Sequence, residues 1–361
     1  MSELRFNRIT GDWVVIANDG RKPGDFLLYK SDTDVLEARV RRKLDSPLSP
    51  PRVVDCPFCP GNEGLWETIS TLDRGGSWGV RLVSHKGGLF SPSLEKEEVT
   101  DGTRRRVSGF GYHDVLIEHP AHNRWLWTQP VGHVAEVFEV MRRRYAELGE
   151  DSRVELVVPL KNHGRSAGTA LLHPHSQIVG MPIMAADVRR RLSDAGRFYD
   201  EHGHCLFCEV IEEEAGSAAR VIHQTAEFVS FIPYGALSPF HILVFPIRHS
   251  SDFGQLGESS LADFAGHFRT LLDRIDARLL APDFNFVIRS VLPDRSDARS
   301  FHWYMSIIPH LAGGSGLAMG SGIFINPLLP EDSAKFLREG GETQRGEEPV
   351  DLDVYSGSGL R

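Results

Sequence analysis

Two Cys-x-x-Cys pairs, each followed by two widely spaced histidines, constrain this chain more than any other feature. Cys56 and Cys59 form the first pair, Cys205 and Cys208 form the second, and these are the only cysteines among the 361 residues. A secreted disulfide framework would be denser in cysteine and would not leave every cysteine in a close pair. Two interpretations remain, a redox pair with reactive thiolates and a metal site completed by histidines further along the chain.

The same order of motifs follows each cysteine pair. An apolar run, a proline and a histidine come first, and then an amphipathic helix, a β-rich segment and a second histidine. The histidines are His122 and His173, 51 residues apart, in the first half, and His249 and His302, 53 apart, in the second. The sequence therefore predicts a duplicated unit of about 150 residues, divided into domains 1–195 and 196–361.

Each half contains one long amphipathic helix. Apolar residues recur at i, i+3, i+4 and i+7 in both segments, which indicates a helix with one buried face. The positions are Val134, Val137, Phe138, Met141, Tyr145 and Leu148 in the first half, and Leu261, Phe264, Phe268, Leu271, Ile275 and Leu279 in the second. Short strands joined by loops, with one such helix in each unit, predict an α+β fold in which an antiparallel sheet is backed by helices.

The spacing of cysteines and histidines predicts two closed metal sites. The first candidate set is Cys56, Cys59, His122 and His173, and the second is Cys205, Cys208, His249 and His302. Zinc suits four mixed sulfur and nitrogen ligands in tetrahedral geometry, and a closed site of this kind is structural. Iron is an alternative at the second site. The competing interpretation is that the thiols are small core residues, and the duplication weighs against it.

Residues 161–178 carry the pattern most typical of catalysis. Gly164 and Gly168 would let backbone amides approach an anion closely. His173, His175 and Gln177 alternate, so on a strand they would share one face. An imidazole beside a phosphate-binding loop, with an amide donor two residues on, suits nucleophilic attack on phosphorus. The alternative is a polar strand edge whose histidines have no chemical role.

Charge and composition limit the classes of binding partner that the sequence favours. The formal net charge is −9 and the pI is about 6.0, which argues against binding of nucleic acid through a basic face. The N-terminal residues lack the layout of a signal peptide. The longest uncharged stretch, residues 311–330, is rich in glycine, so a membrane span is not expected. We therefore expect a soluble, cytoplasmic protein with neither a nucleic-acid nor a membrane partner.

The chain resembles the galactose-1-phosphate uridylyltransferase family, a branch of the histidine-triad superfamily. The resemblance covers most of the chain and is carried by residues 7–15, 56–63 and 161–178. In the C-terminal half, residues 301–304 and 322–332 look like the ADP-glucose phosphorylase subgroup of that family. The resemblance implies two tandem histidine-triad-like domains, a homodimer whose active site borrows residues across the interface, and a place in nucleotide-sugar and galactose metabolism.

The resemblance also implies roles for individual residues. His175 would be the nucleophile and Gln177 would hydrogen-bond the phosphate of the covalent intermediate. The implied substrate-binding residues are Asn162, Gly168, Thr169, Arg21 and Lys22. Thr169 would substitute for a serine of the family, and the two basic residues lie in a shifted register. Tyr304 falls two residues after His302, so the second half would be the degenerate copy.

The resulting prediction is a nucleotidyltransferase that works by double displacement. His175, with a ring N–H held by the carbonyl near His173, would take a nucleoside monophosphate from a nucleotide sugar and pass it to a sugar 1-phosphate or inorganic phosphate. Ping-pong kinetics would follow. The alternatives are a nucleotide hydrolase of the histidine-triad type and a zinc-stabilised nucleotide-binding protein without catalysis. His113 and Glu118, which flank the apolar run before His122, are expected to be solvated strand ends.

Overall fold

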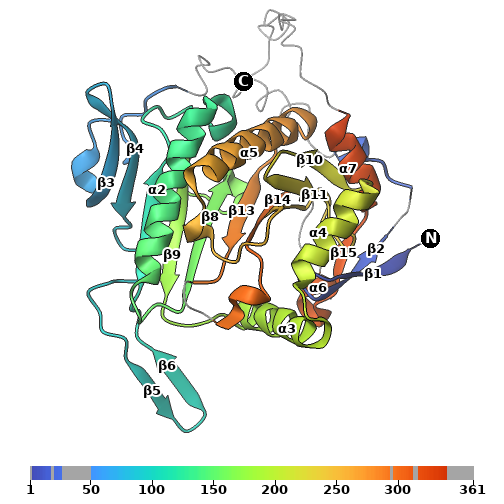
Figure 1. Cartoon of the computed structure of the whole chain (residues 1–361). Coiled ribbons are helices and arrows are strands. Elements are labelled where there is room, and N and C mark those ends of the chain that lie inside the picture. The colour runs from blue at the N-terminus through green and yellow to red at the C-terminus, as the bar shows by residue number, and fades with distance from the viewer. Residues whose placement is uncertain (1, 18–19, 27–49, 293–295, 312–315, 340–361) are drawn as a thin grey trace, which may run out of the picture.

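A ten-stranded antiparallel sheet runs through the whole molecule (Figure 1). The computed structural model describes residues 2–17, 20–26, 50–292, 296–311 and 316–339. The strands of the sheet, in spatial order, are β10 (Val221–Gln224), β11 (Phe228–Phe231), β12 (Ile242–Pro246), β14 (Tyr304–Pro309), β13 (Phe284–Arg289), β8 (Leu156–His163), β9 (His175–Met181), β7 (Tyr112–Ile117), β4 (Ser77–Ser84) and β3 (Thr68–Arg74).

The order of these strands shows the duplication that the sequence predicts. The two halves meet where β8 pairs with β13, and Leu160 lies opposite Val287. Leu160 also lies opposite Gln177 of β9, as Val287 lies opposite Ser306 of β14. Gln177 and Ser306 are therefore equivalent positions, and two residues earlier Tyr304 stands where the first half has His175.

Two long helices cover one face of the sheet. Helix α2 (Val131–Gly149) packs against β7, β8 and β9, helix α5 (Glu258–Arg278) packs against β10 and β11, and the two helices contact each other. All twelve apolar positions of the predicted helical faces are buried in this core. The amphipathic patterns therefore identified both helices and the faces that they bury.

The opposite face is covered unevenly. Alternate residues of β12 enter two cores, since Ile242 and Val244 face the long helices while Leu243 and Phe245 face helices α3 (Ala186–His202) and α4 (Leu206–Ser217). In the first half a third core, built around Phe58, covers part of this face. Asn162 and Gln177 remain half-buried there, which leaves this face accessible next to His175.

Smaller elements complete the molecule. A three-stranded sheet joins β1 (Glu3–Asn7) and β2 (Asp12–Ile16) to β15 (Phe324–Asn326), and a separate hairpin consists of β5 (Glu98–Asp101) and β6 (Arg104–Val107). The remaining helices are α6 (Gly316–Ser321), α7 (Pro330–Arg338) and the 3-10 turns η1 (Pro23–Phe26), η2 (Glu63–Leu65), η3 (Leu126–Thr128), η4 (Arg165–Ala167), η5 (Phe253–Gln255) and η6 (Ser296–Arg299).

The architecture is the α+β fold expected from the sequence, with one antiparallel sheet shared by both halves. Helix α3 runs across the residues at which the sequence places the domain boundary, and the division into 1–195 and 196–361 remains a prediction. Within the described ranges, no helix combines the length and the apolar character that crossing a membrane requires.

Candidate active site and metal centres

His175 begins strand β9 on the accessible face of the sheet. Its neighbours across the sheet are Ile117 of β7 on one side and the end of β8 on the other. The side chain is 7% exposed and packs edge-on against the ring of Phe58, with 5.3 Å between ring centroids. His175 and Gln177 share this face as predicted, whereas His173 lies before the strand begins.

The hydrogen bonding of His175 leaves one ring nitrogen free to react. Its Nδ1 lies 2.7 Å from the carbonyl oxygen of His173. A carbonyl can only accept, so Nδ1 carries the proton and Nε2 keeps its lone pair. Burial and, to a smaller extent, the nearby charge of Lys161 lower the pKa of His175 to about 4. The ring is therefore neutral near pH 7, as a nitrogen nucleophile must be.

A buried ion pair lies behind His175, on the face that the long helices cover. Lys161 Nζ donates to Glu118 Oε1 over 2.7 Å and to the carbonyl oxygen of His175 over 2.9 Å. The Ser176 hydroxyl donates to the same Glu118 oxygen over 2.6 Å. Both charged side chains are at most 2% exposed. The pair therefore holds the main chain of His175 in place from behind.

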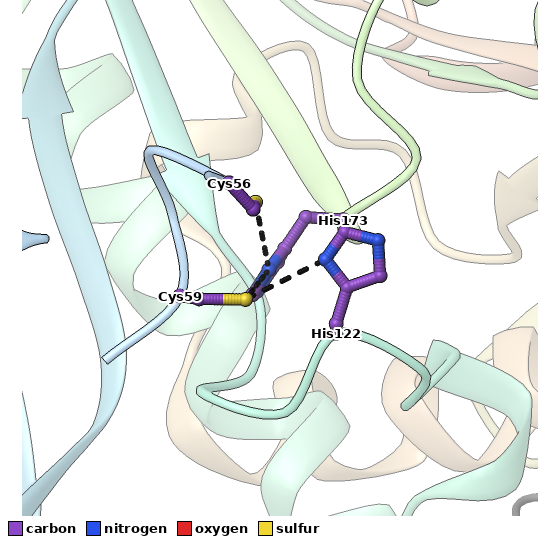
Figure 2. A group of neighbouring side chains, drawn as sticks. All are labelled: Cys56, Cys59, His122 and His173. Atoms are coloured by element: carbon purple, nitrogen blue, oxygen red, sulfur yellow. Dashed lines mark hydrogen bonds between the residues drawn. The ribbon is translucent and has the colours of Figure 1, made fainter. Parts of the chain in front are cut away.

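The first predicted metal set comes together as one cluster (Figure 2). Cys56, Cys59, His122 and His173 place their four ligand atoms within 4.8 Å of one another. Three Sγ–Nδ1 separations are 3.6 Å. A tetrahedral zinc ion with Zn–S and Zn–N bonds of about 2.3 and 2.0–2.1 Å would set sulfur and nitrogen about 3.6 Å apart. The residues present therefore fit the ion.

The hydrogen bonding and the burial of these ligands support a metal site here. His173 presents Nδ1 to the cluster because its Nε2 donates to the carbonyl of His119 over 2.8 Å, the arrangement that orients metal-binding histidines. Burial raises the pKa of the Cys56 thiol to about 11, a penalty that a bound divalent cation would offset. Since His173 also holds His175 through its carbonyl, the cluster and His175 are directly coupled.

The second set forms an equivalent cluster at the start of α4. Its four ligand atoms, from Cys205, Cys208, His249 and His302, also lie within 4.8 Å of one another. Cys208 Sγ lies 3.3 and 3.6 Å from the two Nδ1 atoms. Hydrogen bonds from Cys208 and the two histidines lower the pKa of the Cys205 thiol to about 3 despite its burial, so a thiolate is available for a cation.

The loop between β8 and β9 differs in part from the sequence interpretation. The Gly164–Gly168 turn does bind a carboxylate, but it is the side chain of Asp283, which accepts from the Ser166 amide and hydroxyl over 2.8 and 2.7 Å. The Thr169 hydroxyl donates to the Leu171 carbonyl within the loop. Asn162, at the end of β8, remains on the His175 face, and an added Cβ at Gly168 would lie 3.9 Å from its Nδ2.

Arg21 and Lys22 are not brought to His175 within this chain. They precede η1, whose Phe26 enters the main core, and η1 packs against α7. Helix α7 in turn packs against β10, the edge strand at the other end of the sheet from β3. A contribution of these two residues to the His175 site remains a prediction.

The sequence analysis predicted that His113 and Glu118 are solvated strand ends, and that prediction was wrong. His113 is 8% exposed and bonds to Gln177, and Glu118 is fully buried against Lys161. They do face opposite sides of the sheet, as their spacing predicts, but His113 meets Gln177 of the adjacent strand β9, and Glu118 meets Lys161 of β8, one strand further along. The signals that could have found them are the pairing of β7 with β9 and the place of β8 beyond β9, which the local pattern does not contain.

Several known proteins are similar to this chain. The N-terminal domain of DUF4931, a domain of unknown function, matches residues 110–184. ADP-glucose phosphorylase of Arabidopsis thaliana is 32% identical over 93% of this chain and 92% of its own length. Galactose-1-phosphate uridylyltransferase of Thermotoga maritima is 24% identical over 94% of this chain and 98% of its own.

Solved structures show the same relationship. The crystal structure of an Arabidopsis thaliana ADP-glucose phosphorylase with bound ADP-glucose superposes with a TM-score of 0.77 at 30% identity, covering 94% of this chain and 98% of that one. The fold and site thus define a nucleotidyltransferase with histidine-triad-like architecture. The chain belongs to the family that contains the galactose-1-phosphate uridylyltransferases and ADP-glucose phosphorylase.

Proposed function

We propose that this protein transfers a nucleoside monophosphate from a nucleotide sugar, either a UDP-hexose or ADP-glucose, to a sugar 1-phosphate or inorganic phosphate. The observation that carries the proposal is the hydrogen bond from His175 Nδ1 to the His173 carbonyl, which leaves a neutral Nε2 on the accessible face. Similarity to ADP-glucose phosphorylase over most of both chains supports an ADP-glucose phosphorylase-like reaction as the first one to examine.

The reaction takes place in two displacements at one phosphorus atom. His175 Nε2 attacks the α-phosphorus, the bond to the bridging oxygen breaks, and sugar 1-phosphate leaves with the electron pair. A phosphate oxygen of the acceptor then attacks the same phosphorus and the P–N bond breaks, which returns the electron pair to Nε2. Both leaving groups are weakly basic, so neither step needs a strong general acid. Gln177 stabilises the charge that develops on the phosphate oxygens.

Zinc would be held by both Cys₂His₂ clusters, and its contribution there is structural rigidity. At the first cluster it would fix His173, whose carbonyl orients His175, and the loop that carries Phe58. At the second it would fix the start of α4. Iron at the second cluster is the alternative, and metal analysis of the purified protein distinguishes the two.

A homodimer is part of the proposal. Arg21 and Lys22 lie at the opposite end of the sheet from β3, so they can reach a nucleotide phosphate at His175 only from a second subunit. Mixed dimers test this arrangement. Combining His175→Ala chains with Arg21→Ala/Lys22→Ala chains should restore activity that neither variant has alone, since one site in each mixed dimer is intact. Mixtures as inactive as their components would contradict the shared site.

Intact-protein mass spectrometry tests the covalent step. The protein is incubated separately with ADP-glucose, UDP-glucose, GDP-mannose and a deoxythymidine sugar nucleotide, and a mass gain of one nucleoside monophosphate is expected with the true donor. His175→Ala should gain nothing. Tyr304→Phe is the matched control, since Tyr304 occupies the equivalent position of the second half, and it should label like the wild type. An adduct on His175→Ala would contradict the assignment of the nucleophile.

The acceptor distinguishes the remaining candidates. If added phosphate or sugar 1-phosphate discharges the adduct faster than water does, the protein is a transferase. If water is as fast as either acceptor, it is a nucleotide hydrolase. Tight nucleotide binding without any adduct would indicate a binding protein without catalysis.

A further inference from the structure

The two carboxamides on the His175 face, Gln177 and Asn162, can each present either an oxygen or an NH₂ group to a phosphate. Only the NH₂ group can donate a hydrogen bond to phosphate oxygens. Shape alone does not decide between the two orientations, because the oxygen and the nitrogen of an amide are nearly the same size. At both residues a main-chain group decides, because a main-chain N–H can only donate and a carbonyl can only accept.

His113 determines the orientation of Gln177. The main-chain N–H of Leu89 donates to His113 Nδ1 over 3.2 Å, so this nitrogen is an acceptor and the ring is neutral. The proton of the ring is then on Nε2, which lies 2.9 Å from Gln177 Oε1. The Gln177 oxygen therefore accepts, and its NH₂ group is left for a ligand.

The surroundings of His113 hold its ring in this position. His85 stacks on it, with 4.3 Å between centroids and 18° between the ring planes. An added Cβ at Gly88 would lie 3.1 Å from His113 Cβ and 3.2 Å from Nδ1. The absence of a side chain at residue 88 thus lets the following amide reach the ring.

Asn285, from the second half, determines the orientation of Asn162. Its Nδ2 lies 2.9 Å from the carbonyl oxygen of Ala167, which identifies this atom as the NH₂ group. The same Nδ2 donates to Asn162 Oδ1 over 2.7 Å, and His310 Nε2 bonds the other end of the Asn285 amide. Asn162 therefore also has its oxygen occupied and its NH₂ group available.

Both amides lie beside the nucleophile. Leu160 is opposite Gln177, so residue 162, two positions further along β8, falls level with His175 and on the same face. Neither the Gln177 nor the Asn162 NH₂ group bonds to another residue in the ranges that the structure describes. Two donors therefore lie on the same face as His175 and beside it, where they can reach the phosphate oxygens of the transferred group.

We propose that His113 and Asn285 are positioning residues that hold the Gln177 and Asn162 carboxamides with both NH₂ groups directed at the phosphate attached to His175. This inference rests on the proposed function for the identity of that phosphate. It adds two residues that never touch the substrate, one of them contributed by the second half of the chain.

The second half contains a matched version of the His113 contact. Ser306 is equivalent to Gln177 through the strand register, and His241 Nε2 lies 2.8 Å from the Ser306 hydroxyl. The duplicated sheet thus brings an imidazole to this position in both halves. Only in the first half does it meet an amide beside the proposed nucleophile, so His241→Phe is a control at the equivalent strand position, in a more deeply buried setting.

The rate of adduct formation with the donor tests the proposal. His113→Phe and Asn285→Leu should each slow this step about 10- to 100-fold. This effect is smaller than the roughly 100- to 1000-fold rate loss typical when an oxyanion donor is removed, because the amide donor is still present but less well oriented. His241→Phe should keep the wild-type rate. When Gln177→Ala is already present, His113→Phe should have little further effect on the rate. When Asn162→Ala is already present, Asn285→Leu should likewise have little further effect. His113→Gln, which keeps an N–H near the position of Nε2, should recover part of the rate.

Equilibrium binding gives a second readout that does not depend on the chemistry. With ADP and adenosine as probes, His113→Phe should weaken ADP binding about 10-fold and leave adenosine binding unchanged, because only the phosphates receive the amide donors. Equal loss for both probes, or full additivity with Gln177→Ala, would overturn the proposal. A wild-type protein that forms no adduct but shows this selective loss would refute the proposed function and leave the positioning roles intact.

Discussion

At the residue scale, the environment of His175 is built from both faces of the sheet. The carbonyl of His173 sets its tautomer, Phe58 packs against its ring, and Lys161 holds its main-chain oxygen from behind. Of these three contacts, only the first follows from neighbours in sequence. The contact of Lys161 joins β9 to the preceding strand β8, and that of Phe58 joins β9 to a segment more than 100 residues earlier in the chain.

The buried ion pair behind His175 gives a prediction at this scale. Lys161→Met leaves the Glu118 carboxylate buried without its partner, and we expect a loss of about 3–5 kcal/mol in the free energy of unfolding. The double variant Lys161→Met/Glu118→Gln removes the stranded charge and should recover most of that loss. Urea unfolding measures both, and a single variant within about 1 kcal/mol of the wild type would contradict the argument.

His241 gives a prediction about pH. Burial lowers its pKa to about 3, with help from Arg191 and Arg289, whereas an unfolded histidine has a pKa of about 6.5. Between these values only the unfolded chain takes up the proton, so wild-type stability falls as the pH drops below about 6.5, by up to about 1.4 kcal/mol per pH unit from this residue. His241→Phe lacks this contribution.

The measurement is the free energy of unfolding of both proteins at several pH values. The variant should be less stable than the wild type at pH 7.5, because it loses the bond to Ser306, and the gap should narrow steadily below pH 6. Parallel curves would show that the pKa of His241 is the same in the folded and the unfolded chain, which would contradict the prediction.

At the element scale, the loop between β8 and β9 is held in place by the second half of the chain. Gly164 has a φ of +85° and an added Cβ would lie 1.8 Å from Asp283 Oδ1. The Asp283 carboxylate occupies the turn where the sequence interpretation placed a phosphate. The glycine is therefore required by an internal contact.

Gly164→Ala tests this contact. A positive φ alone costs alanine about 1–2 kcal/mol, and the overlap with Asp283 should make the loss larger and displace the loop that leads to β9. Gly203→Ala is the comparison for a positive φ without steric overlap, because Gly203 has a φ of +77°, a ψ of 7° and nothing within 4 Å of its added Cβ. Gly164 has a ψ of 163°, in a region that essentially only glycine adopts, which adds to the loss expected there. Thermal unfolding of the two variants should differ, and equal losses would show that Asp283 moves aside freely.

At the scale of the whole molecule, the two metal clusters occupy equivalent places but differ in what they support. The first contacts His175 through His173 and Phe58, whereas the second borders the core that contains Tyr304, whose hydroxyl accepts from Arg191. The duplicated scaffold therefore has the proposed reactive histidine in one half and a tyrosine at the equivalent position in the other.

Removing one ligand from each cluster separates these roles. Cys59→Ser should lose metal and slow adduct formation about 10- to 100-fold, the usual cost of disturbing the groups that orient a metal ligand. Cys208→Ser should lose metal and lower the unfolding temperature, with a rate close to that of the wild type. Metal content, unfolding temperature and adduct rate are measured on both variants, and equal rate losses would contradict the division of roles.

The sequence by itself determined the α+β class, the two long helices and their buried faces, both Cys₂His₂ sets and the pair His175 and Gln177. These features depend on short-range periodicity, on spacing repeated in two halves, or on a motif resemblance, and all of these are present in the linear chain. The helical faces agree because burial of an apolar stripe dominates the choice of helix orientation.

Only the tertiary structure decided which side chains complete the site. His113 meets Gln177 across 64 residues, and Asn285 meets Asn162 across 123. Such contacts depend on strand order and register, where a slip of one residue would turn each side chain to the other face. The sequence interpretation left His113 and Glu118 in solvent because a polar residue at a strand end shows its partner only once the neighbouring strands are in place.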